Sequence, residues 1–368
     1  MDNPHFVKTG SSSFFGEYLY AQVVPQNHFL RQLNIIIDWE RFTRRLLRLY
    51  KGGGMVGRPP FDPAMILKME LIAYLYNLTE RQVEVFINEN LPAKYFVGLA
   101  VDQAAPDHST LSVFRERLVK RGKQIVFEVL LEEIVQLALS KGIRFGAIQI
   151  VDSVHSIANV NTDKDQHRQG KGKGPRDPDA HWGVKHTRKV KNEDGKEEKQ
   201  IEYFYGYKAH ISLNAESGLI TSLETTSGEA PDGHHFTSLV DHDLKQSLPV
   251  DTYTADKAYD DGENHYNLEV RGLHSAIRLK RTRIEKKDDA RQVWVELCRH
   301  PQYQKGLQER YKIERKFGEA KQGHGFSRCR YLGRMGFMVQ AFFIVIILNL
   351  KRLVNLLTGV GFKTQVAA

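Results

Sequence analysis

The chain has 368 residues, of which 41% are hydrophobic, and a formal net charge of +9 with a pI near 9.3. This length can bury one or two cores and excludes a short binding motif. Two cysteines exclude a disulfide framework and a multi-cysteine zinc site, and they fit a reducing cytoplasm. The positive charge favours a polyanionic partner, because phosphates neutralised by Lys or Arg release counterions. A basic protein without a nucleic-acid role is the alternative.

The N-terminal part of the chain predicts helices only. Residues 1–37 are interpreted as a lead without a signal-peptide pattern, and residues 38–142 have helical apolar spacing. Asp62 followed by Pro63 predicts a helix start before an apolar face at residues 64–76.

Two further helices are predicted in this region. The Thr79 to Gln82 spacing is that of a capping box, which predicts a helix reaching Asn88. A third helix at residues 110–121 is expected to be basic on its exposed side. Three short helices with a basic last one are similar to a helix-turn-helix and predict a DNA-binding domain. The alternative is the solvated face of a small bundle. The expected DNA contacts are Arg115, Arg117, Lys120 and Arg121.

From residue 143 the pattern changes to short apolar runs alternating with helical segments, which predicts an α/β fold with a mixed sheet flanked by helices over residues 143–336. The expected order is a strand at 145–151, a hairpin of strands 201–213 and 218–226, a helix at 232–246, a strand at 250–255, a helix at 261–270, a strand at 275–279 and a helix at 307–322.

Residues 161–200 interrupt this order as a polar insertion. Between Lys164 and Lys191 the insertion holds nine Lys or Arg residues against three acids. It is interpreted either as a solvated, partly disordered segment or as a loop that follows phosphates.

Residues 337–368 are expected to form a C-terminal helix and tail. The apolar run 337–350 is too short to cross a bilayer, so a buried helix ending at Lys351 and Arg352 is predicted and a membrane role is excluded.

Three separated carboxylates carry the expected chemistry. Asp152 and Asp256 each follow a short predicted strand, and the carboxyl ends of neighbouring strands meet along one edge of an open sheet. Glu314 lies on the last predicted helix, with Arg310 and Lys321 on the same helical face and suited to phosphates. Each acid alone is also typical of a turn, a cap or a surface ion pair.

Oxygen ligands without a cysteine or histidine cluster favour Mg²⁺ or Mn²⁺ over zinc. Two such ions about 4 Å apart activate the attacking oxygen and stabilise the leaving oxygen of a phosphoryl displacement. The sequence therefore predicts a site for two divalent ions.

At these residues the sequence resembles the DDE transposases of bacterial insertion sequences, which have an RNase H-like catalytic domain. The first and second acids lie in the segments Ile150–Ser153 and Thr254–Asp260, and the family's second strand matches Tyr205–His210. The third acid lies in a Tyr-x2-Arg-x3-Glu-x6-Lys signature formed by Arg310, Glu314 and Lys321, with Leu307 at the tyrosine position. Gly57 to Arg117 is similar to the family's N-terminal domain, and Asn349–Arg352 also fits.

The resemblance implies a transposase that binds double-stranded DNA at the element ends, nicks it by water attack and uses the freed 3′-hydroxyl to attack target DNA. Asp152, Asp256 and Glu314 would hold the metal ions, and Arg310 and Lys321 would contact phosphates near the cleaved bond. A homodimer or a larger assembly is expected on DNA, because two ends must meet.

The resemblance also assigns expectations to neighbouring residues. Lys257, Tyr259 and Asp260 are candidates for supporting the second acid, with Lys257 also a candidate phosphate contact, and Asp260 is alternatively a helix cap. A metal role is conceivable for His155 or His210, and a packing or hydrogen-bonding role is favoured for His210.

Two alternatives to transposition remain open from the sequence. One is a nuclease with the same fold and metals that hydrolyses DNA without strand transfer. The other is a catalytically silent DNA-binding protein derived from such an element. Metal-dependent strand transfer distinguishes the transposase from both.

Overall fold

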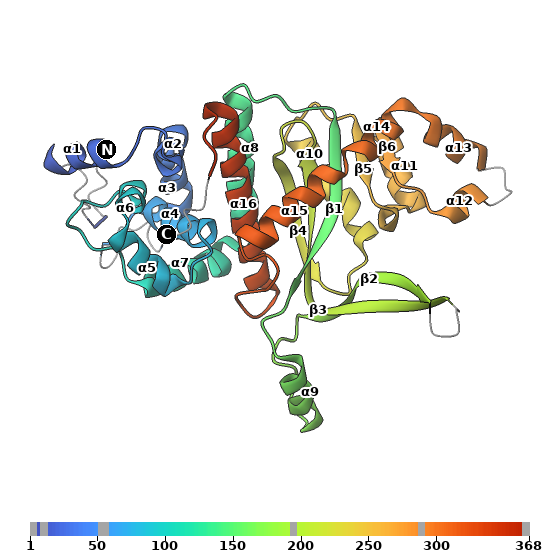
Figure 1. Ribbon diagram of the computed structural model, residues 1–368, viewed down its shortest axis with the longest axis horizontal. Coiled ribbons are helices and arrows are strands. Elements are labelled where there is room, and N and C mark those ends of the chain that lie inside the picture. Colours follow the sequence, from blue (N-terminus) through green and yellow to red (C-terminus); the bar gives the residue numbers. More distant parts are fainter. Residues whose placement is uncertain (1–5, 8–13, 51–58, 192–196, 286–290, 363–368) are drawn as a thin grey trace. The chain divides into compact units, whose positions relative to one another are not determined.

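The structure is a computed structural model that describes residues 6–7, 14–50, 59–191, 197–285 and 291–362. The chain divides into two compact units (Figure 1). Unit 1 comprises residues 1–134 and 343–368, and unit 2 comprises residues 135–342. The long helices α8 (Lys123–Ser140) and α16 (Arg334–Thr358) contribute residues to both.

Unit 1 is helical, as predicted for residues 38–142. The region predicted as an N-terminal lead also contains two helices, so that prediction was incomplete; Gly57 and Arg58, at the start of the segment resembling the family, lie outside the described residues. Besides the long helices, the helices of unit 1 are α1 (Phe14–Val23), α2 (Phe29–Ile36), α3 (Trp39–Leu47), α4 (Pro63–Leu75), α5 (Glu80–Glu89), α6 (Leu91–Val97), α7 (His108–Arg117) and the π-helical turn η2 (Leu118–Gly122).

The predicted helix starts in unit 1 are confirmed. The Asp62 side chain accepts a hydrogen bond from the Ala64 N–H at the start of α4, with Pro63 in the first turn. Thr79 and Gln82 form both hydrogen bonds of a capping box at the start of α5. The α4 helix is buried on every side rather than on one apolar face, so it is the central helix of this unit.

The basic helix predicted at residues 110–121 differs from the prediction in two ways. It begins at His108 and gives way to a π-helical turn after Arg117. Arg115 is not on an exposed face, because its side chain is only 12% exposed and lies between the carboxylates of Glu70 and Glu80. Arg115 therefore acts as a structural ion-pair residue of the helical unit.

Unit 2 contains the predicted mixed sheet. Its strands are β1 (Ile148–Ile157), β2 (His181–Lys191), β3 (Glu197–Asn214), β4 (Ile220–Ser227), β5 (Thr252–Ala255) and β6 (His274–Ile277). The order β2-β3-β1-β5-β6 combines antiparallel pairing of β1 with β3 and parallel pairing of β1 with β5 and of β5 with β6, and β4 pairs with β3. The predicted hairpin of two strands corresponds to β3 and β4 and is confirmed.

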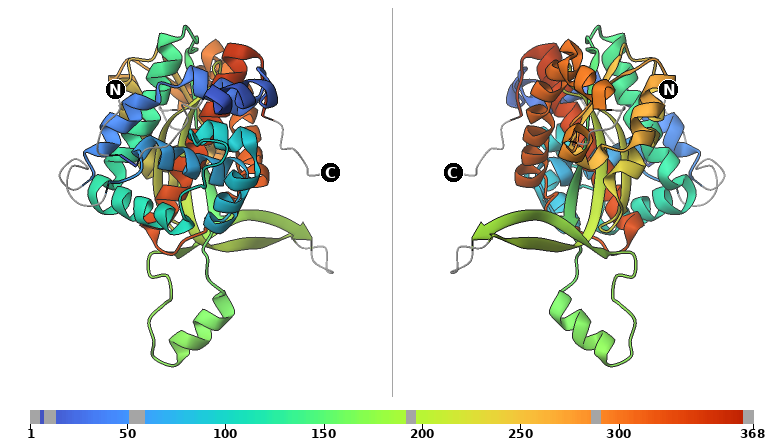
Figure 2. Two further views of the ribbon diagram at one scale, coloured as in Figure 1. Left: turned by 90° about the vertical axis from the view of Figure 1, so that its left-hand side faces the viewer. Right: turned by 90° about the vertical axis from the view of Figure 1, so that its right-hand side faces the viewer.

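The polar insertion has regular structure that the sequence pattern did not predict. It contains α9 (Thr162–Gly170) and β2, and β2 pairs with the first half of the long strand β3. Figures 1 and 2 show that α9 and the far end of the β2–β3 hairpin extend beyond the rest of unit 2. Residues 192–196 of the insertion lie outside the described part of the chain.

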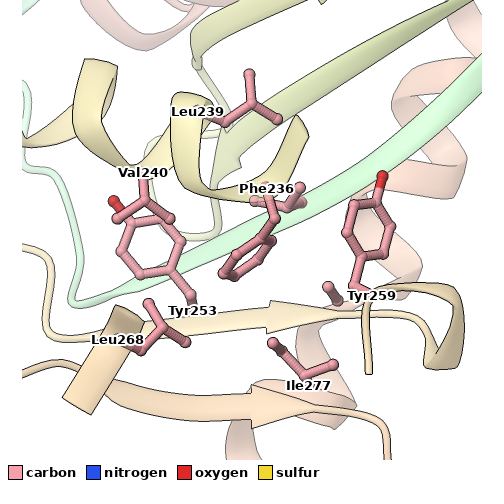
Figure 3. Close-up of a cluster of buried hydrophobic side chains, with 9 residues drawn as sticks. Phe236, Leu239, Val240, Tyr253, Tyr259, Leu268 and Ile277 are labelled. Atoms are coloured by element: carbon pink, nitrogen blue, oxygen red, sulfur yellow. The ribbon is translucent and has the colours of Figure 1, made fainter. Parts of the chain in front are cut away.

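Helices cover both faces of the sheet. On one face, Phe236, Leu239 and Val240 of α10 (Phe236–Lys245) pack with Val151 and Tyr253 of the strands (Figure 3). This cluster also includes Leu268 of α11 (Gly262–Val270). The short 3-10 helices η3 (Asp232–His235) and η4 (Lys257–Tyr259) precede α10 and α11.

On the other face, Ala276 and Tyr303 are the centre of a second cluster. The helices that follow β6 in the chain are α12 (Arg281–Glu285), α13 (Arg291–Arg299), α14 (Pro301–Glu309) and α15 (Tyr311–Gly323). The sequence pattern predicted neither α12 nor α13, and it merged the end of α14 with α15 into one helix. The two helices are separate and meet at Arg310.

The apolar C-terminal run lies within a longer helix than predicted. Helix α16 spans 25 residues and continues beyond Lys351 and Arg352 to Thr358. Within the described part of the chain it is the one helix that is long and apolar enough to cross a membrane by length and composition. Its most apolar window is 89% buried, which a core helix also shows.

Candidate active site

The strand register brings the first two predicted acids together. The parallel pairing of β1 with β5 ends at Val151 opposite Ala255, and Asp152 and Asp256 are the next residues on the two strands. Neighbouring strands lie about 4.8 Å apart, so successive positions after a paired residue stay adjacent. Asp152 does not end its strand as predicted, because β1 continues to Ile157 and pairs with β3.

A single guanidinium faces both acids. The Arg310 side chain lies 3.7 Å from Asp152 Oδ2 and 3.8 Å from Asp256 Oδ1 and is only 13% exposed. Its Nε is buried without a hydrogen-bond partner. Arg310 therefore lies against the two acids. The sequence analysis had predicted only a phosphate contact for this residue.

A close helix-to-sheet contact sets the position of Arg310. A Cβ atom on Gly306 would lie 2.6 Å from Ala276 Cβ and 3.3 Å from Thr254 Cβ. The absence of a side chain there allows α14 to lie directly on β5 and β6, one turn before Arg310. Gly306 is thus a positioning residue that sequence reasoning missed, and its signal would have been a glycine inside an otherwise regular helix.

The surroundings of Asp152 disfavour its negative charge. Burial raises the pKa of Asp152 from 3.8 to about 7. The Ser153 N–H and Arg310 oppose this shift in pKa, whereas the charges of Asp256 and Asp232 add to it. The pKa of Asp152 stays raised although Arg310 lies beside both carboxylates, and a divalent cation would add the positive charge that favours the ionised form.

This pKa gives a testable pH dependence. The folded metal-free protein retains a proton on Asp152 that the unfolded chain releases, so stability falls as pH rises from about 4 to 7 and is level above that window. Asp152→Asn removes this effect, and we expect it to stabilise the metal-free protein by about 2 kcal/mol more at pH 8 than at pH 5. Thermal unfolding in EDTA measures this difference, with the exposed Glu263→Gln on α11 as a control that should behave alike at both pH values. Equal gains for Asp152→Asn at the two pH values would contradict the assignment.

The third acid lies on the helix that follows Arg310. Glu314 is exposed in the first turn of α15, and α15 packs against β1, the strand of Asp152. Glu314 is therefore on the element that neighbours the acid pair, with its carboxylate open to solvent.

The carboxylates do not form a closed cluster in this structure. Among the described residues, the one group of three His, Cys, Asp or Glu side chains with ligand atoms within 4.8 Å of one another is Glu84, Asp107 and His108, in unit 1. Those residues serve the start of α7: Asp107 caps the helix, and Glu84 Oε2 accepts the His108 N–H at 2.9 Å. We interpret that group as a helix-start cluster.

A second basic position lies near the first strand. Lys321 is half-buried, and burial together with the charge of Lys185 lowers its pKa. Burial and then the charge of Lys321 lower the pKa of His155 to about 4, so the ring is neutral at pH 7. The predicted cation Lys321 therefore lies within electrostatic reach of β1 and of Lys185 on β2.

The residues after Asp256 divide into two groups. Tyr259 is fully buried, and its pKa is raised first by burial and then by the charges of Asp152 and Asp232, which agrees with the predicted supporting role near the acids. Lys257 is exposed, and its backbone N–H donates to Asp256 Oδ1 at 2.6 Å.

Asp260 does not support the second acid, contrary to the prediction. Its carboxylate accepts the Lys280 N–H at 2.7 Å and pairs with Arg283 at 2.6 Å. The helix cap alternative was also wrong, because Asp261 caps α11.

One acid near the site was missed by the sequence reasoning. Asp232, at the start of η3, raises the pKa of Asp152, and its Oδ1 lies 2.9 Å from Lys208 Nζ. His210 beside it is buried with its Nε2 2.9 Å from Thr226 Oγ1, which confirms the hydrogen-bonding role predicted for this histidine.

The predicted DNA contacts of unit 1 occupy different environments. Arg117 stacks on the Tyr50 ring at 3.8 Å, and Arg121 donates to the Leu49 carbonyl at 2.8 Å. Lys120 is 71% exposed and pairs with Glu116. Arg117, Lys120 and Arg121 remain candidates for phosphate contacts, unlike the enclosed Arg115.

Comparisons with known families agree with this geometry. The family described as "Transposase domain (DUF772)" matches residues 18–117, and the family described as "Transposase DDE domain" matches residues 166–350, half of the chain. The second match begins after Asp152 and so does not include the first predicted acid. No solved structure matches the chain. Such domains cleave DNA by phosphoryl transfer, and the chain therefore belongs to the DDE transposases of insertion sequences.

Proposed function

We propose that this transposase binds the ends of its element and catalyses metal-dependent cleavage followed by strand transfer into target DNA. The observation that carries the proposal is that Asp152 and Asp256 directly follow the last paired residues of the parallel strands β1 and β5 and face one guanidinium. Carboxylate oxygens that lie close together are the ligands that Mg²⁺ or Mn²⁺ prefers.

We infer that Asp152, Asp256 and Glu314 hold the metal ions. Asp152, whose pKa is raised by burial, would release its proton when metal binds. The bound metal would lower the pKa of the attacking hydroxyl and stabilise the leaving oxygen. Exposed Glu314 would complete the ligand set from α15 as DNA enters.

The cations have separate parts in this proposal. Arg310 neutralises the acid pair and stabilises charge on the phosphate near them, while Lys321 and Lys257 contact neighbouring phosphates. Water attack breaks the bond between phosphorus and the 3′-oxygen and leaves a free 3′-hydroxyl. That hydroxyl then attacks a target phosphate, displacing a target 3′-oxygen, so no covalent intermediate with the protein forms.

The helical unit would supply recognition of the element ends, through Arg117, Lys120 and Arg121 rather than Arg115. Joining two ends calls for at least a dimer on DNA. We place the protein in the cytoplasm, bound to the nucleoid when it acts.

The decisive assay uses duplex DNA carrying the terminal sequences that flank the gene. With Mg²⁺, we expect the wild-type protein to cut these ends and join them to a target plasmid, and Glu314→Gln to lose the joined products. Cleavage without joining by the wild type would instead support the nuclease. Binding without either reaction would support the silent DNA-binding protein.

A further inference from the structure

The insertion between β1 and β3 forms an arm, which we define as residues 158–191 and 197–206. We propose that this arm binds the sugar-phosphate backbone of the duplex next to the cleaved phosphate. This inference rests on the proposed function and adds a contact surface to it. The arm comprises α9, β2 and the first half of β3, and it extends beyond the rest of unit 2 (Figures 1 and 2).

The first observation is the fate of the acids in the arm. Asp165 is buried and accepts the Arg176 N–H at 2.9 Å, and buried Asp177 accepts the Tyr207 hydroxyl at 2.6 Å. Exposed Asp179 accepts the Arg334 N–H at 3.0 Å. These three acids therefore fold and anchor the arm, and of the three only Asp179 leaves a negative charge at its outer surface. Asp163 is the other exposed acid between residues 158 and 185.

The second observation is the set of cations on that surface. Arg168 is exposed and donates to the Gly174 carbonyl, a bond that leaves its charge in place. Four more exposed cations have no acidic partner within 4.0 Å among the described residues: Lys164, Lys171, Lys173 and Arg176. Over residues 158–179 these five exposed cations outnumber the two exposed acids, Asp163 and Asp179. A surface with this excess of positive charge attracts phosphates and releases their counterions.

The third observation is an exposed apolar face on the hairpin. Opposed residues of antiparallel strands share a face, and Trp182 lies opposite Tyr205 and Val184 opposite Tyr203. Trp182 is 51% exposed and Tyr203 56% exposed, and the Trp182 and Tyr205 rings are 5.4 Å apart. Flat rings beside cations suit contact with the deoxyribose rings of a DNA backbone, while the cations contact its phosphates.

The arm is electrostatically continuous with the site. Lys185 of β2 lowers the pKa of Lys321 and of His155, so it lies within reach of the proposed phosphate contact on α15. A DNA strand held at Lys321 would therefore meet the arm at Lys185, which also pairs with Glu202 of β3. This order places the arm on duplex adjoining the cleaved bond.

A second copy of the chain is the main competing occupant of the apolar face. Two identical arms would bring their unneutralised cations together, and like charges repel. DNA has the complementary charge and is the substrate of the enzyme. The observations therefore favour DNA as the occupant.

The first test compares two variants with the same change in charge, using full-length protein and duplex carrying the element's terminal sequence. The arm variant is Lys164→Gln, Lys171→Gln, Lys173→Gln and Arg176→Gln. The control replaces exposed cations elsewhere in unit 2, Lys141→Gln, Lys245→Gln, Arg299→Gln and Lys305→Gln. We expect the arm variant to bind DNA about 10- to 100-fold more weakly than the wild type. The slope of log affinity against log salt concentration should become less steep by about two to three. The control should change affinity less than about twofold.

The second test reads the contact directly. DNA should quench the tryptophan emission of the wild-type protein, and Trp182→Phe should lose that part of the signal while its exposed position preserves the fold. The arm proposal would be refuted if the wild type and the arm variant bound DNA with the same salt dependence and DNA left the Trp182 emission unchanged. The proposed function would then still stand. If the Trp182 emission changed with protein concentration in the absence of DNA, the apolar face would be a contact between two copies of the chain, and the arm proposal would also be refuted. If the wild type bound no DNA, the proposed function itself would fail.

Discussion

Asp152→Asn, Asp256→Asn and Glu314→Gln should each reduce Mg²⁺-dependent cleavage and strand transfer by about 10³-fold or more. The physical reason is that each substitution replaces a charged oxygen ligand with a neutral amide of nearly the same shape. For Asp152 and Asp256, it also leaves Arg310, 3.7 to 3.8 Å away, without one of its two acidic neighbours. DNA binding should remain close to that of the wild type, because the proposed phosphate contacts are retained.

The matched control for these variants is Glu296→Gln, an exposed glutamate on α13 with the same chemical change. It should cut and join DNA at the wild-type rate. Cleavage that persists in one of the three variants would remove that residue from the metal site. A parallel loss of DNA binding would indicate instead that the substitution disturbs the fold.

Arg115→Met should lower the free energy of unfolding by about 3 to 5 kcal/mol. The Arg115 side chain is 12% exposed and lies 3.4 Å from Glu70 Oε1, and the Glu70 side chain is 1% exposed. Removing the guanidinium leaves a carboxylate deep in unit 1 without this cation, and a buried charge of that kind is strongly unfavourable.

Urea unfolding followed by circular dichroism measures this loss. Lys120→Met, on an exposed ion pair five residues later, should cost less than about 0.5 kcal/mol. Adding Glu70→Leu to Arg115→Met should recover much of the stability, because it removes the buried carboxylate that has lost the Arg115 guanidinium. If Arg115→Met were as stable as the wild type but bound DNA weakly, Arg115 would instead be the DNA contact that the sequence predicted.

The buried arginine also shows the limit of sequence reasoning about charge. The sequence prediction placed Arg115 and Lys120 on one basic side of a helix, although positions five apart lie about 140° apart on a helical wheel. Helical spacing therefore separates the two residues, but it does not identify the partners of Arg115. Those partners, Glu70 and Glu80, are 45 and 35 residues away in the chain.

The sequence by itself determined what depends on near neighbours. The caps at Asp62 and Thr79, the hairpin of β3 and β4, and the short strand before Asp256 follow from turn chemistry and apolar alternation within a few residues. The three acids were found because each stands at a recognisable place beside a strand or on a helix. Whether all three act as metal ligands remains a prediction.

Only the tertiary structure decided which of these residues meet. The β1–β5 register makes Asp152 and Asp256 neighbours, and the contact at Gly306 brings Arg310 to them. The polar insertion looked unstructured because its apolar residues are few, yet β2 is held by main-chain hydrogen bonds to the first half of β3, whose second half pairs with β1 and β4. Register, close approach and burial of charge arise from pairs far apart in the chain, so they become definite only when the chain is folded.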